Sequence, residues 1–574
     1  MAGFVNPRDG WVLVRSTAAT RAGGQVDLSV ERLTGPVGDE PAQRGVRAAA
    51  RSLQVTHAKE APQVLETMRF LQAGEYRVGV RLQGPATLTA LAVCAVPELI
   101  FCKFQYNPHV QPHGPYDWDF LQRHVLPNVN CIVGSGAPEH EPMVQRWKQQ
   151  GKRWIIECGV PGLDSPEPLT ADEAYAYWAR NPGFQDPLLD GVIADEFLGD
   201  GPRMKYPQWT EAVRRLGTGA APGGKLFYPY CTAIHRQRAG ADFLRVVMQQ
   251  GYPFAWEQYL SEPATASDAR QRLASRLAAE MLRWRQALPG CERHLVVCFG
   301  YMSMPATETL NINPQVDYKV WMDMQFNHIA TDSAFRDVYG LMEYTCGYAD
   351  EETVRWASRL YRHYGLEGAT NLLSPRYGFG FHLDHLQNPD FADAAHGWTL
   401  EPAEDGSAAG RTVKGYSWLQ GRYPRTDLGD TFLWTRRSVR APNRASQVVR
   451  SLRPGRLYSL KMVTADYGEL QRGKSAEHKH AVSLELRGVE WVSAKCFQYP
   501  IPNNYAHGLG AFNAQNKAWM NYHFRVFRSR GFEARLTISD WASATEPGGP
   551  AGQELMFNFL ELQPYFSEEM ESLP

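Results

Sequence analysis

The sequence lacks several features that assign a function class directly. No run of roughly 18 apolar residues occurs, so we expect no membrane span. The 60 Lys and Arg residues balance the 61 Asp and Glu residues without forming a basic stripe, so nucleic acid is not an expected partner. The motifs GxSxG and GxxxxGK[ST] are absent, which argues against a serine nucleophile elbow and a phosphate-binding loop.

Cysteine use is also sparse. The nine cysteines form no CxxC pair. Free cysteine is among the most buried residue types, so we interpret these residues as small core side chains and not as a disulfide framework. Six of them lie on predicted strands: Cys102, Cys131, Cys158, Cys231, Cys298 and Cys346.

The start of the chain shows no recognisable leader. The segment MAGFVNPRDGWVLV has no charged region followed by an apolar region, as a signal peptide would. A cytoplasmic protein fits this start, and so does a secreted or periplasmic protein that has lost its signal peptide.

The main feature present is a series of eight short apolar segments, each followed by a helix-like segment. Apolar residues in the intervening segments recur every three or four positions, which is typical of helices packed on a sheet. Eight strand–helix units predict a (β/α)8 TIM barrel. A doubly wound open sheet gives a similar alternation, but no GxGxxG turn follows the first strand. The predicted strands are 98–106, 130–134, 153–159, 191–197, 225–231, 253–260, 294–301 and 339–346.

Strand-like sequence flanks this region on both sides. Residues 1–97 alternate apolar and polar residues between Gly, Pro and Asp turns, which predicts an N-terminal β-sandwich. The barrel is expected over 98–368, and the Gly-rich segment 369–387 is expected to be a linker or a packed connection. About eight further strands over 388–574 predict a β jelly roll.

The last third of the chain resembles a known type of module. Asn388-Pro389-Asp390-Phe391, followed by Gly397-Trp398, is similar to the opening of jelly-roll carbohydrate-binding modules with the galactose-binding-like fold, and MFNFLELQPYF resembles their final strand. The order sandwich, barrel, jelly roll resembles multidomain glycoside hydrolases, although no individual family is assigned. The resemblance implies a carbohydrate partner. No cofactor is expected, and a structural calcium ion in the jelly roll is an open alternative.

Two glutamates are the candidate catalytic residues. Glycoside hydrolysis uses one carboxyl group to protonate the leaving oxygen and a second to attack the anomeric carbon or activate water. Many retaining barrel glycosidases carry the acid/base at the end of strand four, usually after Asn; Glu196 matches this position, with Asp195 in place of the Asn. The usual nucleophile position on strand seven has no carboxylate. We therefore predict Glu257 on strand six as the partner, with Glu308 as a fallback.

Each glutamate is the last residue of an Ala-x-Glu sequence, and residues two apart share one face of a strand. If the alanines lie inside the barrel, both glutamates are therefore expected to point toward the barrel axis. Other polar and aromatic residues at predicted strand ends are candidates for substrate binding. They are Glu157, Asp195, Glu343, Tyr106, His109, Tyr230, Trp256, Tyr259 and Tyr301. In the jelly roll, Trp418, Trp434 and Trp491 are either sugar-stacking or core residues.

Two other function classes remain open at this point. A glycan-binding barrel without catalytic activity would have the same sequence pattern. A metal-dependent barrel hydrolase would need ligands such as His109 and His113, but their His-x-x-x-His spacing in a proline-rich loop differs from the His-x-His that barrel metallohydrolases carry after strand one. We therefore predict no catalytic metal.

Overall fold

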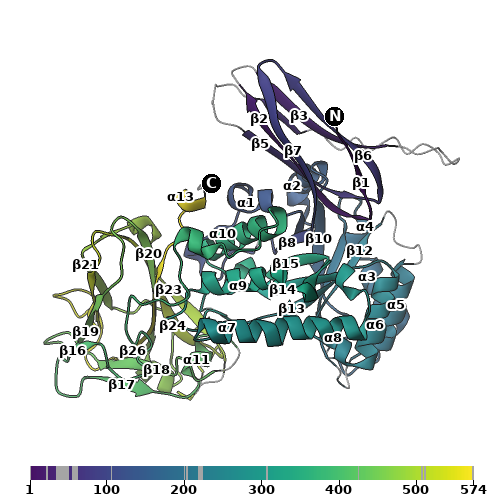
Figure 1. Cartoon of the computed structure of the whole chain (residues 1–574). Coiled ribbons are helices and arrows are strands. Elements are labelled where there is room, and N and C mark those ends of the chain that lie inside the picture. Colours follow the sequence, from purple (N-terminus) through teal and green to yellow (C-terminus); the bar gives the residue numbers. More distant parts are fainter. Residues whose placement is uncertain are drawn as a thin grey trace.

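The structure is a computed structural model of the 574-residue chain. It describes residues 2–20, 24–33, 51–54, 63–104, 106–163, 165–199, 201, 204–217, 224–305, 308–423, 426–505, 508–509 and 512–571. Along the chain, an N-terminal β-sandwich is followed by a (β/α)8 barrel and then by a C-terminal jelly roll of two antiparallel sheets (Figure 1).

The eight predicted central strands form one closed parallel barrel, in which each strand pairs with the next and the last pairs with the first. The segments at 191–197 and 226–231 are parallel neighbours, as the barrel prediction requires. The strands are β8 (Glu98–Cys102), β9 (Cys131–Gly134), β10 (Arg153–Cys158), β11 (Gly191–Phe197), β12 (Leu226–Cys231), β13 (Phe254–Gln258), β14 (Leu295–Gly300) and β15 (Gly340–Tyr344).

Helices cover the outside of the barrel, and side-chain caps define where several of them begin. Thr170 forms a capping box with Glu173, and Asp350 accepts a hydrogen bond from the Thr353 amide. The main helices are α1 (Trp118–His124), α2 (Glu141–Gln149), α3 (Ala171–Ala179), α5 (Tyr206–Arg215), α6 (Arg238–Gln249), α7 (Ala266–Leu273), α8 (Ala279–Ala287), α9 (Tyr318–Thr331) and α10 (Glu351–Leu360). A π-helical turn, η6 (Ala274–Ala278), joins α7 to α8.

The barrel has a packed interior and a separate outer core. Aliphatic and cysteine side chains fill the interior together with Tyr228 and Tyr230. Cys102, Cys131 and Cys298 belong to this group, as expected for cysteines that act as core residues. The outer core lies between the strands and the helices and contains fully buried Trp154 and Trp256. Each strand is thus buried on both faces, which explains its continuous apolar sequence.

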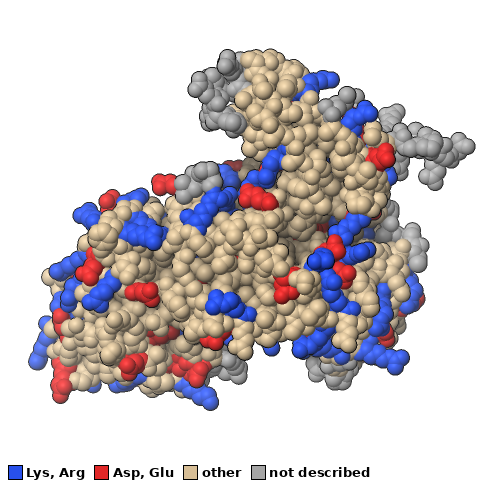
Figure 2. Space-filling view, viewed as in Figure 1, with Lys and Arg blue, Asp and Glu red and all other residues tan. Residues whose placement is uncertain are grey.

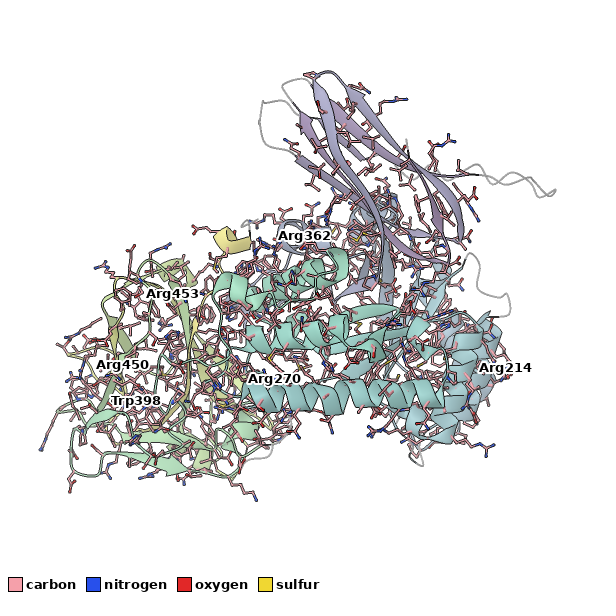
Figure 3. The ribbon with its side chains drawn as sticks, in the orientation of Figure 1. Arg214, Arg270, Arg362, Trp398, Arg450 and Arg453 are labelled. Atoms are coloured by element: carbon pink, nitrogen blue, oxygen red, sulfur yellow. The ribbon has the colours of Figure 1, made fainter. Side chains whose placement is uncertain are left out.

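The N-terminal sandwich closes the end of the barrel where the strands begin. Glu98, fully buried, accepts hydrogen bonds from Trp11 of the sandwich (3.2 Å), from Arg153 (2.8 Å) and from Tyr228 (2.8 Å). Arg362, labelled in Figure 3, adds an ion pair of 2.9 Å to Glu66 of the sandwich. These contacts fix the sandwich to the barrel.

The sandwich itself consists of two antiparallel sheets. One has the order β1-β6-β3-β4 and the other β5-β2-β7. The strands are β1 (Ala2–Asn6), β2 (Gly10–Thr20), β3 (Gln25–Arg32), β4 (Arg51–Gln54), β5 (Gln63–Leu71), β6 (Gly74–Gln83) and β7 (Ala86–Val96). On the face shown in Figure 2, the sandwich carries few charges, whereas positive and negative side chains are interspersed over the rest of the molecule.

The C-terminal domain also consists of two sheets. One, in the order β16-β19-β25-β21, comprises Thr399–Glu401, Arg444–Val449, Ala534–Ser539 and Ser483–Arg487. The other has the order β17-β18-β26-β20-β24-β22, with β23 also paired to β24; its strands are β17 (Ala408–Thr412), β18 (Thr431–Arg436), β26 (Glu554–Pro564), β20 (Leu457–Asp466), β24 (Ala518–Ser529), β22 (Val489–Trp491) and β23 (Phe497–Asn503).

The opening motif of this domain is structural. The ring of Trp398, labelled in Figure 3, stacks on Phe391 at 5.0 Å and donates a hydrogen bond to the Asn388 carbonyl. Of the two alternatives for 369–387, the structure shows the packed connection, since Leu373, Tyr377 and other apolar side chains of this segment are buried. The C-terminal domain is therefore joined to the barrel by a fixed connection.

Among the described residues, no helix has the length and apolar character needed to cross a bilayer.

Candidate active site

Three carboxylates point into the barrel where the strands end. In β10, β11 and β13, the residue two positions before each of these carboxylates belongs to the cluster that fills the barrel. Side chains two residues apart share one face of a strand, so these carboxylates continue the inner face into the barrel mouth. They are Glu157, Asp195 and Glu257.

Glu257 is the carboxyl group most strongly biased toward its protonated form at this mouth. It is only partly exposed at the end of β13. Burial, and then the negative charges of Asp195, Glu196 and Glu308, raise the pKa of Glu257 to about 7. This shift favours the protonated form of Glu257 near neutral pH, which is what a general acid requires.

Neighbouring charges of opposite sign have opposing effects on the pKa of Asp195. Burial and the neighbouring Glu157 raise the pKa of Asp195 to about 6, while the ammonium group of Lys103 lowers it. Lys103 forms an ion pair with Glu157, and its Nζ atom lies 4.9 Å from the ring centroid of Tyr106 and 5.2 Å from that of Tyr344. Lys103 thus places a positive charge among the acidic groups of the mouth.

Glu196 lies in a different position from the one that alternation predicts. Ala194 faces the outer core, and the pairing register between β11 and β12 shifts between Ala194 and Phe197. Glu196 occupies this bulge with a φ of 76° and is exposed. Non-glycine residues in this left-handed region are uncommon and cluster at functional sites. Glu196 nevertheless remains close enough to contribute to the pKa values of Asp195 and Glu257.

Tyrosine side chains form one wall of the mouth. The hydroxyl groups of Tyr230 and Tyr259 are 2.5 Å apart, and both rings stack on Tyr344 with centroids 5.8 and 5.9 Å away. Tyr230 is buried, while Tyr259 and Tyr344 are partly exposed. The wall combines flat apolar faces with hydroxyl groups, which suits a sugar ring.

Two candidate residues lie at the rim. Tyr106 is exposed beside Lys103. His109 is exposed and stacks on Tyr348 with ring centroids 4.6 Å apart, and its amide donates a hydrogen bond to the Gly347 carbonyl at 2.8 Å. Burial of part of the ring lowers the pKa of His109, so it is a neutral side chain at physiological pH.

Three other candidates lie away from the inner face. Glu343 and Trp256 follow inner-face residues by a single position, so they point toward the helices, and both are buried. Burial raises the pKa of Glu343 well above its ordinary value, which favours the neutral form. Tyr301 is buried and donates a hydrogen bond to the Cys102 carbonyl at 2.9 Å. The structure does not bring these three side chains into the group around Glu257.

The two histidines after strand one lie in different environments. His109 stays at the rim, whereas His113 is buried against Phe497 and Phe524 of the C-terminal domain. Burial lowers the pKa of His113 to about 4. Within the described parts of the chain, no three or more His, Cys, Asp or Glu side chains are grouped as metal ligands would be. The absence of a catalytic metal stays a prediction.

Sequence reasoning missed several groups near this mouth. Lys103 is a single basic residue directly after β8, and it forms an ion pair with Glu157 on β10. No local sequence pattern predicts a pair between residues so far apart in the chain. Tyr505 of the C-terminal domain donates a hydrogen bond to Glu308 at 2.8 Å. A cavity of about 450 Å³ is lined by Tyr259, Arg272 and Arg276 among other residues.

Comparisons with known proteins identify no close relative. No protein-family model matches the sequence, and no curated protein matches it. Among solved structures, an endo-β-N-acetylglucosaminidase from Cordyceps militaris has 10% identity and a TM-score of 0.31, covering 47% of this chain and 90% of that one. The Group IV chitinase of Ostrinia furnacalis has 12% identity and a TM-score of 0.33, covering 48% and 100%. A calcium-binding mutant of Bacteroides uniformis β-glucuronidase 2 has 8% identity and a TM-score of 0.31, covering 94% and 80%.

Proposed function

We propose that this protein is a glycoside hydrolase that cleaves O-glycosidic bonds of an oligo- or polysaccharide at the mouth of its barrel. The observation that carries the proposal is Glu257, a carboxyl group on the inner face with a pKa of about 7, beside two further carboxyl groups, Asp195 and Glu196. Glycosidases need an acid that is protonated at working pH and a second carboxylate that is not.

In this proposal Glu257 is the general acid. Its raised pKa supports this role better than the reverse assignment, in which Glu196 protonates the leaving group. Glu257 would donate its proton to the glycosidic oxygen as the bond to the anomeric carbon breaks. Glu196, exposed at the bulge, would attack the anomeric carbon or remove a proton from the water molecule that attacks it.

The other groups of the mouth would bind and orient the sugar. Lys103 and Glu157 offer a donor and acceptors for hydroxyl groups, and Asp195 adds a further carboxyl group between them and Glu257. The partly exposed rings of Tyr259 and Tyr344 would stack on the apolar face of a pyranose.

The test is hydrolysis of a broad oligosaccharide panel by three variants. Glu196→Gln and Glu257→Gln keep the side-chain volume but remove the titratable group, so each should lower turnover by roughly 10²–10⁴-fold. Glu343→Gln is the matched control, because it changes a strand-end glutamate that faces the helices, and its turnover should stay near that of the wild type.

Two results would reject the proposal. Near-wild-type rates for both Glu196→Gln and Glu257→Gln, on a substrate that the wild type cleaves, would exclude this pair. Binding of several glycans without cleavage of any would instead favour a glycan-binding barrel without catalytic activity.

A further inference from the structure

The C-terminal domain reaches the barrel mouth through a backbone contact. The loop after β14 pairs in parallel with the segment that follows α11 (Tyr416–Leu419). The Thr309 amide donates to the Gly421 carbonyl at 2.7 Å, and the Tyr423 amide donates to the Thr309 carbonyl at 2.9 Å. Glu308, which contributes to the raised pKa of Glu257, is the residue directly before this contact.

A buried ion pair and further buried hydrogen bonds hold this contact in place. Arg422 is almost fully buried, donates two hydrogen bonds to Asp390 (2.6 and 2.9 Å) and donates a third to the Ile312 carbonyl (2.9 Å). Asn311 from the same barrel loop donates to Glu561 of the C-terminal domain at 2.8 Å. The domain is therefore docked on the barrel and is not a freely tethered module.

Three aromatic side chains gather at this junction. The ring centroids of Trp418 and Tyr505 are 4.6 Å apart, and those of Trp418 and Tyr423 are 6.4 Å apart, each pair inclined by 31°. All three side chains are partly exposed. In contrast, Trp434 of the same domain is buried at 3% exposure, with its ring covered by Arg411, as expected for a core residue.

The aromatic group lies close to Glu308 and Glu257. Tyr505 donates its hydroxyl hydrogen to Glu308 at 2.8 Å. Burial, together with the negative charges of Glu257 and Glu308, raises the pKa of Tyr423. The aromatic group is thus near enough to Glu257 for its charge to affect Tyr423, and its three side chains belong to the C-terminal domain.

We infer that Trp418, Tyr423, Tyr505 and Glu308 form a carbohydrate-binding subsite that the C-terminal domain and the barrel share. Partly exposed rings offer the apolar surface on which a pyranose stacks, and the tyrosine hydroxyls and the Glu308 carboxylate offer partners for sugar hydroxyls. The inference rests on the proposed function and names its substrate class: a chain of several sugars that extends from the mouth over the C-terminal domain.

The experiment compares Trp418→Ala with Trp491→Ala in the full-length protein. Trp491 is also a partly exposed tryptophan of this domain, but it lies on β22 with its ring edge-on to Phe527, within a different core cluster. The probes are hexasaccharides of β-1,4-linked glucose, xylose, galactose and N-acetylglucosamine and of α-1,4-linked glucose, together with the p-nitrophenyl glycosides of the same single sugars. Binding is measured by calorimetry in a Glu257→Gln background, and hydrolysis is measured in the otherwise wild-type protein.

We expect Trp418→Ala to weaken binding of the recognised hexasaccharide about tenfold, which equals ~1.4 kcal/mol. The loss in kcat/KM should be larger for the hexasaccharide than for the p-nitrophenyl glycoside, because only the longer molecule reaches the subsite. Trp491→Ala should match the parent protein in both measurements. Tyr505→Phe, which removes only the hydroxyl bonded to Glu308, should give a smaller loss in the same direction and serves if Trp418→Ala does not fold.

Equal hexasaccharide affinity in Trp418→Ala and Trp491→Ala would overturn the inference, and so would a failure of every hexasaccharide to bind. The binding and hydrolysis results separate the two proposals. Weaker binding in Trp418→Ala without hydrolysis by any form of the protein would support the subsite and reject the hydrolase. Hydrolysis that Trp418→Ala leaves unchanged for all chain lengths would reject the subsite and retain the hydrolase.

Discussion

The raised pKa of Glu257 has a consequence for stability that can be measured without knowing the substrate. Burial and neighbouring carboxylates move this pKa from an ordinary value of 4.5 to about 7. The folded state then binds the proton more tightly than the unfolded state, so the free energy of unfolding falls as the pH rises from about 4.5 to about 7 and stays lower above that range.

Glu257→Gln places a permanently neutral amide at the same position and removes this pH dependence. At ~1.36 kcal/mol per pKa unit, ionising Glu257 costs about 3 kcal/mol in the folded state at alkaline pH. At pH 5 most of this penalty is absent, so the wild type should lose about 2–3 kcal/mol relative to the variant between pH 5 and pH 8.

The assay is thermal unfolding of both proteins at several pH values, with the far-ultraviolet circular dichroism signal as the readout. If the barrel of about 270 residues unfolds as one unit, 2–3 kcal/mol corresponds to a difference in Tm of about 4 °C. Glu257→Gln should therefore gain about 4 °C over the wild type on going from pH 5 to pH 8. A Tm difference that stays constant over this range would show that Glu257 titrates normally, and the argument for its acid role would fail.

Three further predictions concern other parts of the molecule. Treatment with a chelator should leave turnover unchanged, and activity that is lost with chelator and restored by zinc, with unchanged Tm, would contradict this and implicate His109. Arg422→Met should lower the stability of the C-terminal domain by about 3–5 kcal/mol in denaturant unfolding, because it leaves Asp390 as an unpaired buried charge. The control Arg444→Met, at the exposed pair with Glu401, should change this stability by less than about 0.5 kcal/mol. Lys103→Met should shift the acidic limb of the pH profile of kcat/KM upward by about one pH unit, because the Lys103 charge lowers the pKa of Asp195; an unmoved limb would show that Asp195 need not ionise.

The architecture was predictable because its signals are local and repeated. Each barrel strand is a short apolar run followed by an amphipathic helix, and the structure has eight such units in a closed barrel. Strands of the sandwich were also recognisable by alternation, for example over 63–71 and 74–83. Local sequence left open whether 369–387 is a linker or a packed connection, since it is buried by residues distant in the chain, such as Phe566.

The residues of the mouth were only partly predictable, because successive residues of a strand point to opposite faces and the sequence must indicate which set points inward. The small residue Ala255 correctly indicated that Glu257 points inward, and the same alternation implies that Trp256 points outward. For Glu196 the same argument is wrong, because Ala194 faces the outer core and Ile193 faces the interior, and the bulge after Ala194 then shifts the register by a residue. The contact of Tyr505 with Glu308 joins residues almost 200 positions apart, which sequence periodicity cannot show.

The measurement that tests the proposed chemistry most directly is the dependence of turnover on the leaving group in the two glutamate variants. An acidic leaving group such as a nitrophenol needs little protonation, whereas a sugar hydroxyl needs an acid to leave. If Glu257 is the acid and Glu196 the second carboxylate, Glu257→Gln should recover much of its rate on the nitrophenyl glycoside of the cleaved sugar, while Glu196→Gln should stay slow on both substrates. Recovery in Glu196→Gln and not in Glu257→Gln would reverse the roles, and equal, near-wild-type rates in both variants would contradict the assignment of this pair altogether.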